Sequence, residues 1–475
     1  MDGLPVIEAP KLGEATSAIA VGGGRIAQLD TGSSRWIIDA KPGNIRSPVF
    51  SSDASEKKQS NLEDTVTRKD KVMPIAMKDT RPYAVAAAKQ NIDQTAKSSE
   101  SFEQRPKVVY VDSPARIERN INDADYILSG RRYQATPTIS RSGPNRYWAA
   151  WRADNKTAGE GPGNFAVLAY SDDKNKSFKE YGYLTYSPEH PGNQIVDPML
   201  WTDPDGRLWL FYGVLGNNQH YDGVGGSWAI VNDSPNAEDP VWSEPFRLSY
   251  HGVPRVPIKV GDRWYMAIDG WRFSAEEPPM YMDHVGPHIY ELDWKKKRVK
   301  HVSRLPPNNN GQYSGFFETE FVERKDGAVA ALLRWQGKNS QVLFSVSKDG
   351  MRSWTPWQDY KVIAPSSSSR VWLGRTPSGR LLLCWNNDTV RRTLTVGLSE
   401  DEGRSWKFKK IIEPDAAIQV SYPVVAFGDD SEIFVIYDSG RDSNRQIRVS
   451  KVIEQEIISG SSKPLVNVIS DPARQ

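Results

Sequence analysis

The chain has 475 residues, 61 of them basic and 59 acidic, which leaves a net charge of +2. This balance gives no general attraction to nucleic acid, and a single cysteine, Cys384, excludes an intrachain disulfide framework or a cysteine-rich zinc site. No apolar run reaches the roughly 18 residues that a membrane-spanning helix needs. The 16 Trp, 19 Tyr, 36 Gly and 32 Pro residues indicate short strands and tight turns rather than helices.

Residues 1–107 differ in composition from the rest of the chain. They contain only one of the 16 tryptophans, and the stretches 51–71 and 84–104 are rich in Ser, Lys, Ala and Gln. Such a composition buries too little apolar surface to offset the entropy lost on ordering the chain. We therefore expect a polar, poorly structured N-terminal segment. The alternative is an anchor or assembly arm that becomes ordered on a partner.

A turn followed by an apolar strand occurs six times in the remaining sequence. These strands begin at Arg146, Arg207, Arg263, Ala328, Arg380 and Glu432, and a further short apolar segment precedes each turn. The spacing leaves room for about two more strands in every repeat. Six four-stranded antiparallel units predict an all-β fold, a six-bladed β-propeller over residues 108–455, with a loose tail at 456–475.

A second motif recurs in phase with these hairpins, between the third and fourth strands of three repeats. It reads SEDEGRSW at 399–406, SKDGMRSW at 347–354 and SDDKNKSF at 171–178. The aspartate accepts hydrogen bonds from turn amides, glycine or asparagine supplies a positive φ, and the aromatic residue fills the space between sheets. We expect these turns to be structural and not catalytic.

The direction of the strands predicts which residues meet at one rim of the propeller. In an antiparallel hairpin, the first strand starts at the rim where the second strand ends. The residues at this rim are then Arg132, Asp197, Arg255, Glu318, Arg370 and Tyr422 from first strands, Asp154, Asp269, Arg334, Asn386 and Asp438 from second strands, and Arg391 and Arg392 from a third strand. Converging arginines suit a planar carboxylate, which a guanidinium holds in a two-point fork. Ion pairing among the residues themselves is the structural alternative.

The order of these residues resembles the active site of the sialidase (neuraminidase) superfamily. The BNR repeats of that superfamily carry turns like the three described above, which are called Asp boxes. The resemblance covers roughly residues 108–455 in motif order, although the family's usual Arg-Ile-Pro is absent near Arg132. It implies a nucleophile Tyr422, a base Glu318 and an acid Asp154, with Glu160 as the reserve acid. The predicted substrate-binding residues are Arg132, Arg334, Arg391, Arg392, Asp438, Arg255 and Arg370. Among them, the resemblance implies that Asp438 orients Arg132.

The chemistry of sialic acid accounts for these residue types. Its anomeric carbon carries a carboxylate, which would repel an anionic Asp or Glu nucleophile. A neutral tyrosine, deprotonated by a neighbouring glutamate, makes the attack instead. The resemblance therefore implies a retaining exo-glycosidase that removes terminal sialic acid or a related acidic sugar from glycans. It implies no metal and no other cofactor.

Two other functions fit the same residues. A lyase or another hydrolase of uronate-containing polysaccharides would hold the uronate in the arginine ring, with His220 or His251 as a base. A non-catalytic glycan-binding propeller would use the N-terminal segment as its tether. A glycan ligand favours an extracellular or surface location, whereas the N-terminal sequence lacks the pattern of a signal peptide. The compartment therefore stays open.

Overall fold

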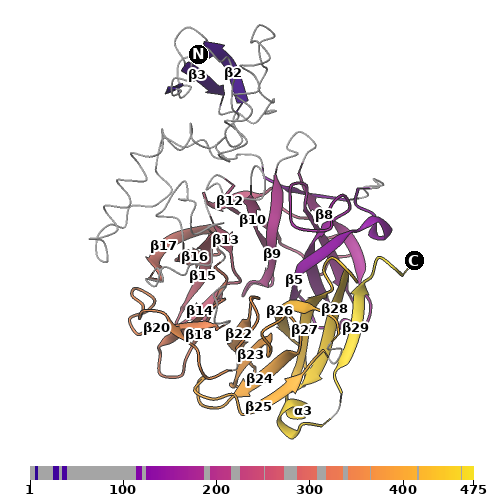
Figure 1. Ribbon diagram of the computed structural model, residues 1–475, viewed down its shortest axis with the longest axis vertical. Coiled ribbons are helices and arrows are strands. Elements are labelled where there is room, and N and C mark those ends of the chain that lie inside the picture. Colours follow the sequence, from indigo (N-terminus) through magenta and orange to yellow (C-terminus); the bar gives the residue numbers. More distant parts are fainter. Residues whose placement is uncertain are drawn as a thin grey trace, which may run out of the picture.

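The structure is a computed structural model that describes residues 6–8, 25–30, 35–39, 114–119, 125–186, 193–215, 225–250, 252–271, 286–306, 317–334, 341–363, 365–413, 417–461 and 463–474. Within these ranges nearly all regular structure is β-strand. Six antiparallel sheets follow one another along the chain and are arranged around a central axis (Figure 1). The predicted six-bladed propeller is confirmed.

Each blade is a continuous stretch of chain, and its first strand is the innermost one. Blade 1 consists of β5 (Tyr133–Arg141), β6 (Tyr147–Asp154), β7 (Phe165–Ser171) and β8 (Lys179–Thr185), with β4 (Arg116–Glu118) outside β8. Blade 2 consists of β9 (Gln194–Thr202), β10 (Leu208–Leu215), β11 (Ser227–Asn232) and β12 (Phe246–Ser249). Blade 3 has a divided inner strand, β13 (Val253–Pro254) and β14 (Ile258–Val260), followed by β15 (Arg263–Gly270), β16 (Gly286–Asp293) and β17 (Arg298–Arg304).

The last three blades repeat this order. Blade 4 consists of β18 (Thr319–Glu323), β19 (Val329–Leu333), β20 (Leu343–Ser347) and β21 (Gln358–Asp359). Blade 5 consists of β22 (Trp372–Arg375), β23 (Leu381–Asn386), β24 (Leu394–Ser399) and β25 (Phe408–Ile411). Blade 6 consists of β26 (Val420–Phe427), β27 (Glu432–Ser439), β28 (Gln446–Ile453) and β29 (Leu465–Ser470).

The expectation of a loose tail at 456–475 is wrong. Helix α3 (Glu454–Ser459) leads into β29, which pairs with β28 and forms the fourth strand of blade 6. The polar residues around β29 masked the pattern of a short strand rich in β-branched residues. This strand is ordered because it pairs with the otherwise unpaired edge of β28. None of the helices in the described part of the chain is long and apolar enough to cross a membrane.

The N-terminal segment forms no part of the six blades in the ranges that the structure describes. Strands β1 (Val6–Glu8), β2 (Arg25–Asp30) and β3 (Arg35–Asp39) are hydrogen-bonded to one another in the order β1-β3-β2. The predicted polar stretches 51–71 and 84–104 lie outside the described residues.

Apolar side chains fill the space between neighbouring blades and close the ring. Trp148 of blade 1 packs with Tyr212 of blade 2, and Trp151 of blade 1 packs in a cluster with Ile436 of blade 6. Burial of an aromatic or large aliphatic side chain contributes about 1.5–3 kcal/mol. The first and last blades therefore join through side-chain packing, because each blade already contains its own four strands.

The Asp-box turns have the hydrogen bonds that the sequence predicts, although in the turn at 347–354 Met351 adopts a φ of 67° at the position that Gly403 and Asn175 hold in the other two. In the turn at 399–406, Asp401 Oδ1 accepts a hydrogen bond from the amide of Ser405 at 2.8 Å, Gly403 has a φ of 81°, and Trp406 is buried. Asn175 has a φ of 65° in the turn at 171–178. These turns connect third to fourth strands, so they lie at the rim opposite the predicted site.

Candidate active site

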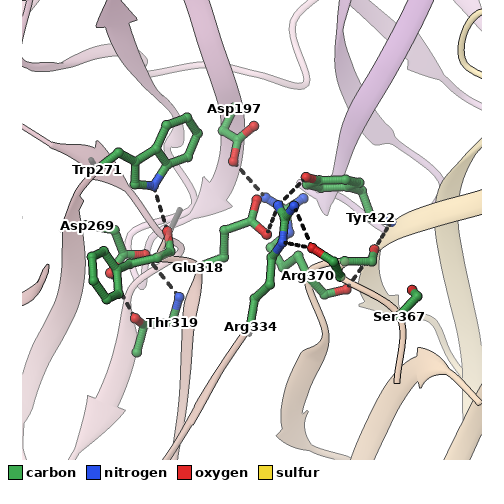
Figure 2. A network of polar contacts seen from close by, with 12 residues as sticks. Asp197, Asp269, Trp271, Glu318, Thr319, Arg334, Ser367, Arg370 and Tyr422 are labelled. Carbon is green, nitrogen blue, oxygen red and sulfur yellow. Dashed lines mark hydrogen bonds and ion pairs between the residues drawn. The ribbon is translucent and has the colours of Figure 1, made fainter. Parts of the chain in front are cut away.

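Three inner strands contain a bulge at the point where they reach the predicted rim. Thr136, Asp197 and Tyr422 each precede a proline and have φ values of 48°, 42° and 57°. The strand register shifts at the same positions in blades 1, 2 and 6. Such a backbone conformation costs about 1–3 kcal/mol outside glycine and persists only where the surroundings impose it. A bulge redirects a side chain, and here it serves Asp197 and Tyr422, which point to a common centre (Figure 2).

Tyr422 is buried among four guanidinium groups. The Cζ atoms of Arg441, Arg370, Arg391 and Arg334 lie 4.7, 5.2, 5.2 and 5.7 Å from the centre of its ring. Burial raises the pKa of the Tyr422 hydroxyl, and the attraction of Arg334 lowers it by less, so the pKa stays above 10.0. The hydroxyl is therefore protonated at neutral pH in the free protein.

Arg334 joins Tyr422 to Glu318. Its Nη1 atom donates to the Tyr422 hydroxyl oxygen at 2.5 Å and to Glu318 Oε2 at 2.7 Å (Figure 2). Glu318, the predicted base, and Tyr422 therefore lie on either side of one donor atom, and both accept a hydrogen bond from it. The side chains of Glu318 and Arg334 are 1% and 6% exposed. A cation at this distance favours the phenolate when the hydroxyl loses its proton.

Ser368 sets the spacing between two of the guanidiniums. Its Oγ accepts hydrogen bonds from Nε and Nη2 of Arg334 at 3.3 and 3.2 Å, and its carbonyl oxygen accepts one from Nη2 of Arg391 at 2.9 Å. Arg391 is half-buried, whereas Arg392 is exposed. Of this predicted pair, the structure brings Arg391 to the cluster and leaves Arg392 outside it.

Asp438 orients an arginine, but a different one from the residue expected. Its Oδ2 atom accepts hydrogen bonds from Arg441 Nη2 at 2.9 Å and from the amide of Thr136 at 3.1 Å. Arg132, which the sequence favoured for this place, is exposed and donates to the carbonyl oxygen of Lys156 at 3.2 Å. Arg132 therefore does not belong to the cluster, because its side chain is directed to the loop that follows β6.

Asp154 stabilises the loop that follows it in the sequence. Its Oδ1 accepts hydrogen bonds from the amides of Lys156 and Thr157 at 2.5 and 2.8 Å, and its Oδ2 accepts one from Asn164 Nδ2 at 2.7 Å. The residue is only 2% exposed. The buried Asp154 carboxylate is thus occupied by donors of its own loop, whereas a general acid has to reach the leaving group.

Glu160, the reserve candidate, lies at the lip of the site. Its Oε1 accepts hydrogen bonds from the Tyr133 hydroxyl at 3.1 Å and from Arg441 Nη1 at 3.3 Å, and its Oε2 lies 3.4 Å from Arg152 Nη1. The side chain remains 46% exposed. Burial among its neighbours raises the pKa of Glu160, but Arg152 and Arg441 together outweigh this effect, so the pKa is lowered.

A second group of charges forms the floor below Tyr422. Arg255 pairs with Asp197 at 2.8 Å and with Asp269 at 2.9 Å, and Arg370 lies 3.4 Å from Asp197. Arg255 and Arg370 are each 1% exposed. Arg255 is thus paired with other rim residues, which is the structural alternative predicted for the arginines. Arg370 lies between Asp197 and the Tyr422 ring.

The described residues contain no group of three His, Cys, Asp or Glu side chains that could hold a metal ion. His220 and His251, the bases of the lyase alternative, lie outside the described residues.

A family profile for the BNR repeat-like domain matches residues 145–435, which is more than half of the chain. The chain belongs to the BNR repeat-like domain family. No curated protein matches its sequence.

Solved structures share the fold of this BNR propeller. They include an intramolecular trans-sialidase from leech (11% identity, 72% of each chain covered, TM-score 0.54) and one from Ruminococcus gnavus (12% identity, 71% of this chain and 98% of that chain, TM-score 0.51). A Hadza microbial sialidase has 12% identity over 65% of this chain and 66% of its own, with a TM-score of 0.51. The propeller is therefore sialidase-like in fold.

Three residues of the BNR propeller's site were not predicted from the sequence. Arg441 follows Asp438 by three positions and Arg152 precedes Asp154 by two, so both stood next to residues that the strand directions had marked. Ser368 lies in the run Ser366–Ser369, whose composition gives no functional signal. Only the folded loops show which atoms these residues contact.

Glu320 makes the stability of the BNR propeller depend on pH. It lies in the inner strand β18, two residues beyond Glu318, so the two side chains are on the same side of the chain. Burial raises the pKa of Glu320 from 4.5 to about 7, and Arg370 and Arg255 offset only part of this rise. Because the pKa is higher in the folded state, the stabilisation is complete below about pH 4.5 and is lost as pH rises through 7.

We expect Glu320→Gln to stabilise the protein at pH 8 by on the order of 1–3 kcal/mol, with little effect at pH 5. The glutamine resembles the neutral acid and avoids a buried charge. Denaturant unfolding at the two pH values measures the difference. An equal pH dependence in variant and wild type would show that Glu320 titrates as an ordinary carboxyl.

Proposed function

We propose that this BNR propeller is a retaining exo-glycosidase of sialidase type, which releases terminal sialic acid or a related acidic sugar from glycans. The observation that carries the proposal is the position of Tyr422, buried beside Glu318 and surrounded by four guanidiniums. A tyrosine in such a field is suited to attack a carbon that carries a carboxylate, because arginines hold the carboxylate and stabilise the phenolate.

In the proposed reaction, the Tyr422 oxygen attacks the anomeric carbon and its proton passes to Glu318. The hydrogen bond from Arg334 to the Tyr422 oxygen strengthens as negative charge develops there. A covalent glycosyl-tyrosine forms, and the leaving oxygen takes a proton from a general acid. Water then attacks the anomeric carbon from the face that the leaving group left, and gives its proton to the same general acid. Tyr422 departs and takes its proton back from Glu318, so the configuration of the sugar is retained.

Glu160 suits the role of general acid and base better than Asp154 does. The Glu160 carboxylate lies at the lip, 46% exposed, where a leaving group would depart. Asp154 is buried and holds three hydrogen bonds from its own loop. Arg391 and Arg441, whose guanidiniums lie 5.2 and 4.7 Å from the Tyr422 ring centre, are the proposed carboxylate ligands.

The comparisons support sialic acid as the first sugar to test. The leech enzyme was solved with 2,7-anhydro-Neu5Ac after soaking with 3′-sialyllactose, and the Ruminococcus gnavus enzyme in complex with oseltamivir carboxylate.

A fluorogenic sialoside tests the proposal, with sugar release followed by fluorescence and the first-formed anomer by NMR. We expect hydrolysis with retention. A uronate-containing polysaccharide is assayed in parallel for the ultraviolet absorbance of an unsaturated product. Unsaturated product together with an intact sialoside would favour the lyase, and glycan binding without turnover of either substrate would favour a non-catalytic propeller.

A further inference from the structure

In the free protein a carboxylate already occupies the arginines at the lip of the site. Glu160 accepts hydrogen bonds from Arg441 and Tyr133 through one oxygen, and its other oxygen lies 3.4 Å from Arg152. Glu160 belongs to a loop between β6 and β7, whereas Arg441 lies beyond the end of β27 in blade 6. The contact therefore links the first blade to the last at the seam where the ring closes.

Arg441 has one nitrogen directed to this contact. Its Nη2 is held by Asp438 at 2.9 Å, and its Nε is buried. Nη1, which carries the hydrogen bond to Glu160, lies on a guanidinium 4.7 Å from the ring centre of Tyr422. A substrate carboxylate bound beside Tyr422 competes for this same nitrogen, and it brings a second negative charge next to Glu160, which repels that carboxylate.

We propose that the acidic sugar displaces Glu160 from Arg441, so that binding of the substrate carboxylate releases Glu160 to take up a proton and act as the general acid. This inference rests on the proposed function. One proton passes from solvent to Glu160 on binding and from Glu160 to the leaving oxygen when the glycosidic bond breaks. Glu160 regains a proton from the water that attacks the intermediate.

The charges around Glu160 make the proton uptake a consequence of the displacement. Its charged or titratable neighbours are Arg152 on β6, Tyr133 on β5, Arg441 from blade 6 and, further away, Asp197 on β9. In the free protein the two arginines lower the pKa of Glu160. When a substrate carboxylate takes Arg441, Glu160 loses one cation and gains a nearby anion, and both changes favour its protonated form.

This exchange couples ligand binding to pH. Because the pKa of Glu160 is higher in the complex than in the free protein, protons and ligand favour each other's binding. Affinity for an acidic ligand should be greatest at low pH and should fall as pH rises through the pKa of the complex. A neutral ligand of the same shape gains nothing from Arg441 and leaves Glu160 ionised.

Calorimetry with 2-deoxy-2,3-didehydro-N-acetylneuraminic acid tests the proposal at pH 6, in two buffers of different ionisation enthalpy. We expect the wild type to take up a substantial fraction of a proton, with an upper limit of about one, and the methyl ester of the ligand to cause no uptake. Glu160→Gln should bind the acid without proton uptake and several-fold more tightly, because no carboxylate has to be displaced.

Glu400→Gln is the matched control for the charge change. Glu400 is 47% exposed and pairs with Arg380 at 3.0 Å, in the Asp-box turn at the opposite rim. This variant should take up protons as the wild type does. Binding of the acid without proton uptake in the wild type, or unchanged uptake in Glu160→Gln, would overturn the displacement alone. A failure of the acid to bind would overturn the proposed function and this inference with it.

Leaving-group dependence tests the acid role of the released Glu160. Glu160→Gln should lose far more activity on 3′-sialyllactose than on a fluorogenic sialoside, because a sugar hydroxyl needs protonation and an acidic phenol does not. Equal losses on the two substrates would contradict a role as general acid.

Discussion

Replacing Tyr422 with phenylalanine is expected to lower kcat/KM on a sialoside by about 10³-fold or more, while the protein stays folded and still binds the acidic ligand. The change removes only the hydroxyl and keeps the ring, which lies among the four guanidiniums. Without the hydroxyl no covalent glycosyl-enzyme can form. The loss should therefore fall on kcat, with little change in the dissociation constant of 2-deoxy-2,3-didehydro-N-acetylneuraminic acid.

Tyr437→Phe provides the control within the same blade. Tyr437 is buried and its hydroxyl donates to Glu413 Oε2 at 3.0 Å, away from the four guanidiniums. Its loss should cost about 1 kcal/mol of stability and leave activity near that of the wild type. If Tyr422→Phe also kept near wild-type activity, the tyrosine nucleophile would be ruled out. A fall of both variants to the same level would point to a loss of structure instead.

Replacing Arg334 with methionine is expected to destabilise the protein by about 3–5 kcal/mol as well as to abolish most activity. Arg334 and Glu318 form a buried pair at 2.7 Å, so removal of the arginine leaves an uncompensated carboxylate that is 1% exposed. The change also removes the donor to the Tyr422 oxygen. The stability loss is measured by denaturant unfolding, and the activity loss on the fluorogenic sialoside.

The double variant Arg334→Met with Glu318→Gln separates the two effects. Removing both charges should restore much of the stability, because a buried pair replaced as a whole costs little. Activity should stay low, since the proposed base is also gone. Arg116→Met, which breaks the exposed pair with Glu244 at 3.1 Å, should cost no more than about 1 kcal/mol. A double variant no more stable than Arg334→Met would show that packing, and not charge, sets the cost.

The sequence by itself determined the six blades and the three Asp-box turns of this propeller. Alternating apolar residues, turn residues and the spacing of the hairpins are local signals, and a hairpin has only one antiparallel direction. That direction also placed Glu318 and Tyr422 at one rim. Strand β29 escaped prediction because its order depends on the free edge of β28, which the sequence does not display.

Only the tertiary structure decided which side chains of the rim reach the centre. Strand direction could not separate Asp154 from Glu160, because the choice depends on whether the turn amides bind the first carboxylate, as those of Lys156 and Thr157 do. Strand direction also could not show that Arg441, and not Arg132, lies in the cluster. Arg441 comes from the opposite end of the propeller sequence and meets blade 1 only after the ring closes. A strand sets the rim at which a residue lies, whereas the direction of its side chain follows from hydrogen bonds that loops distant in sequence make with one another.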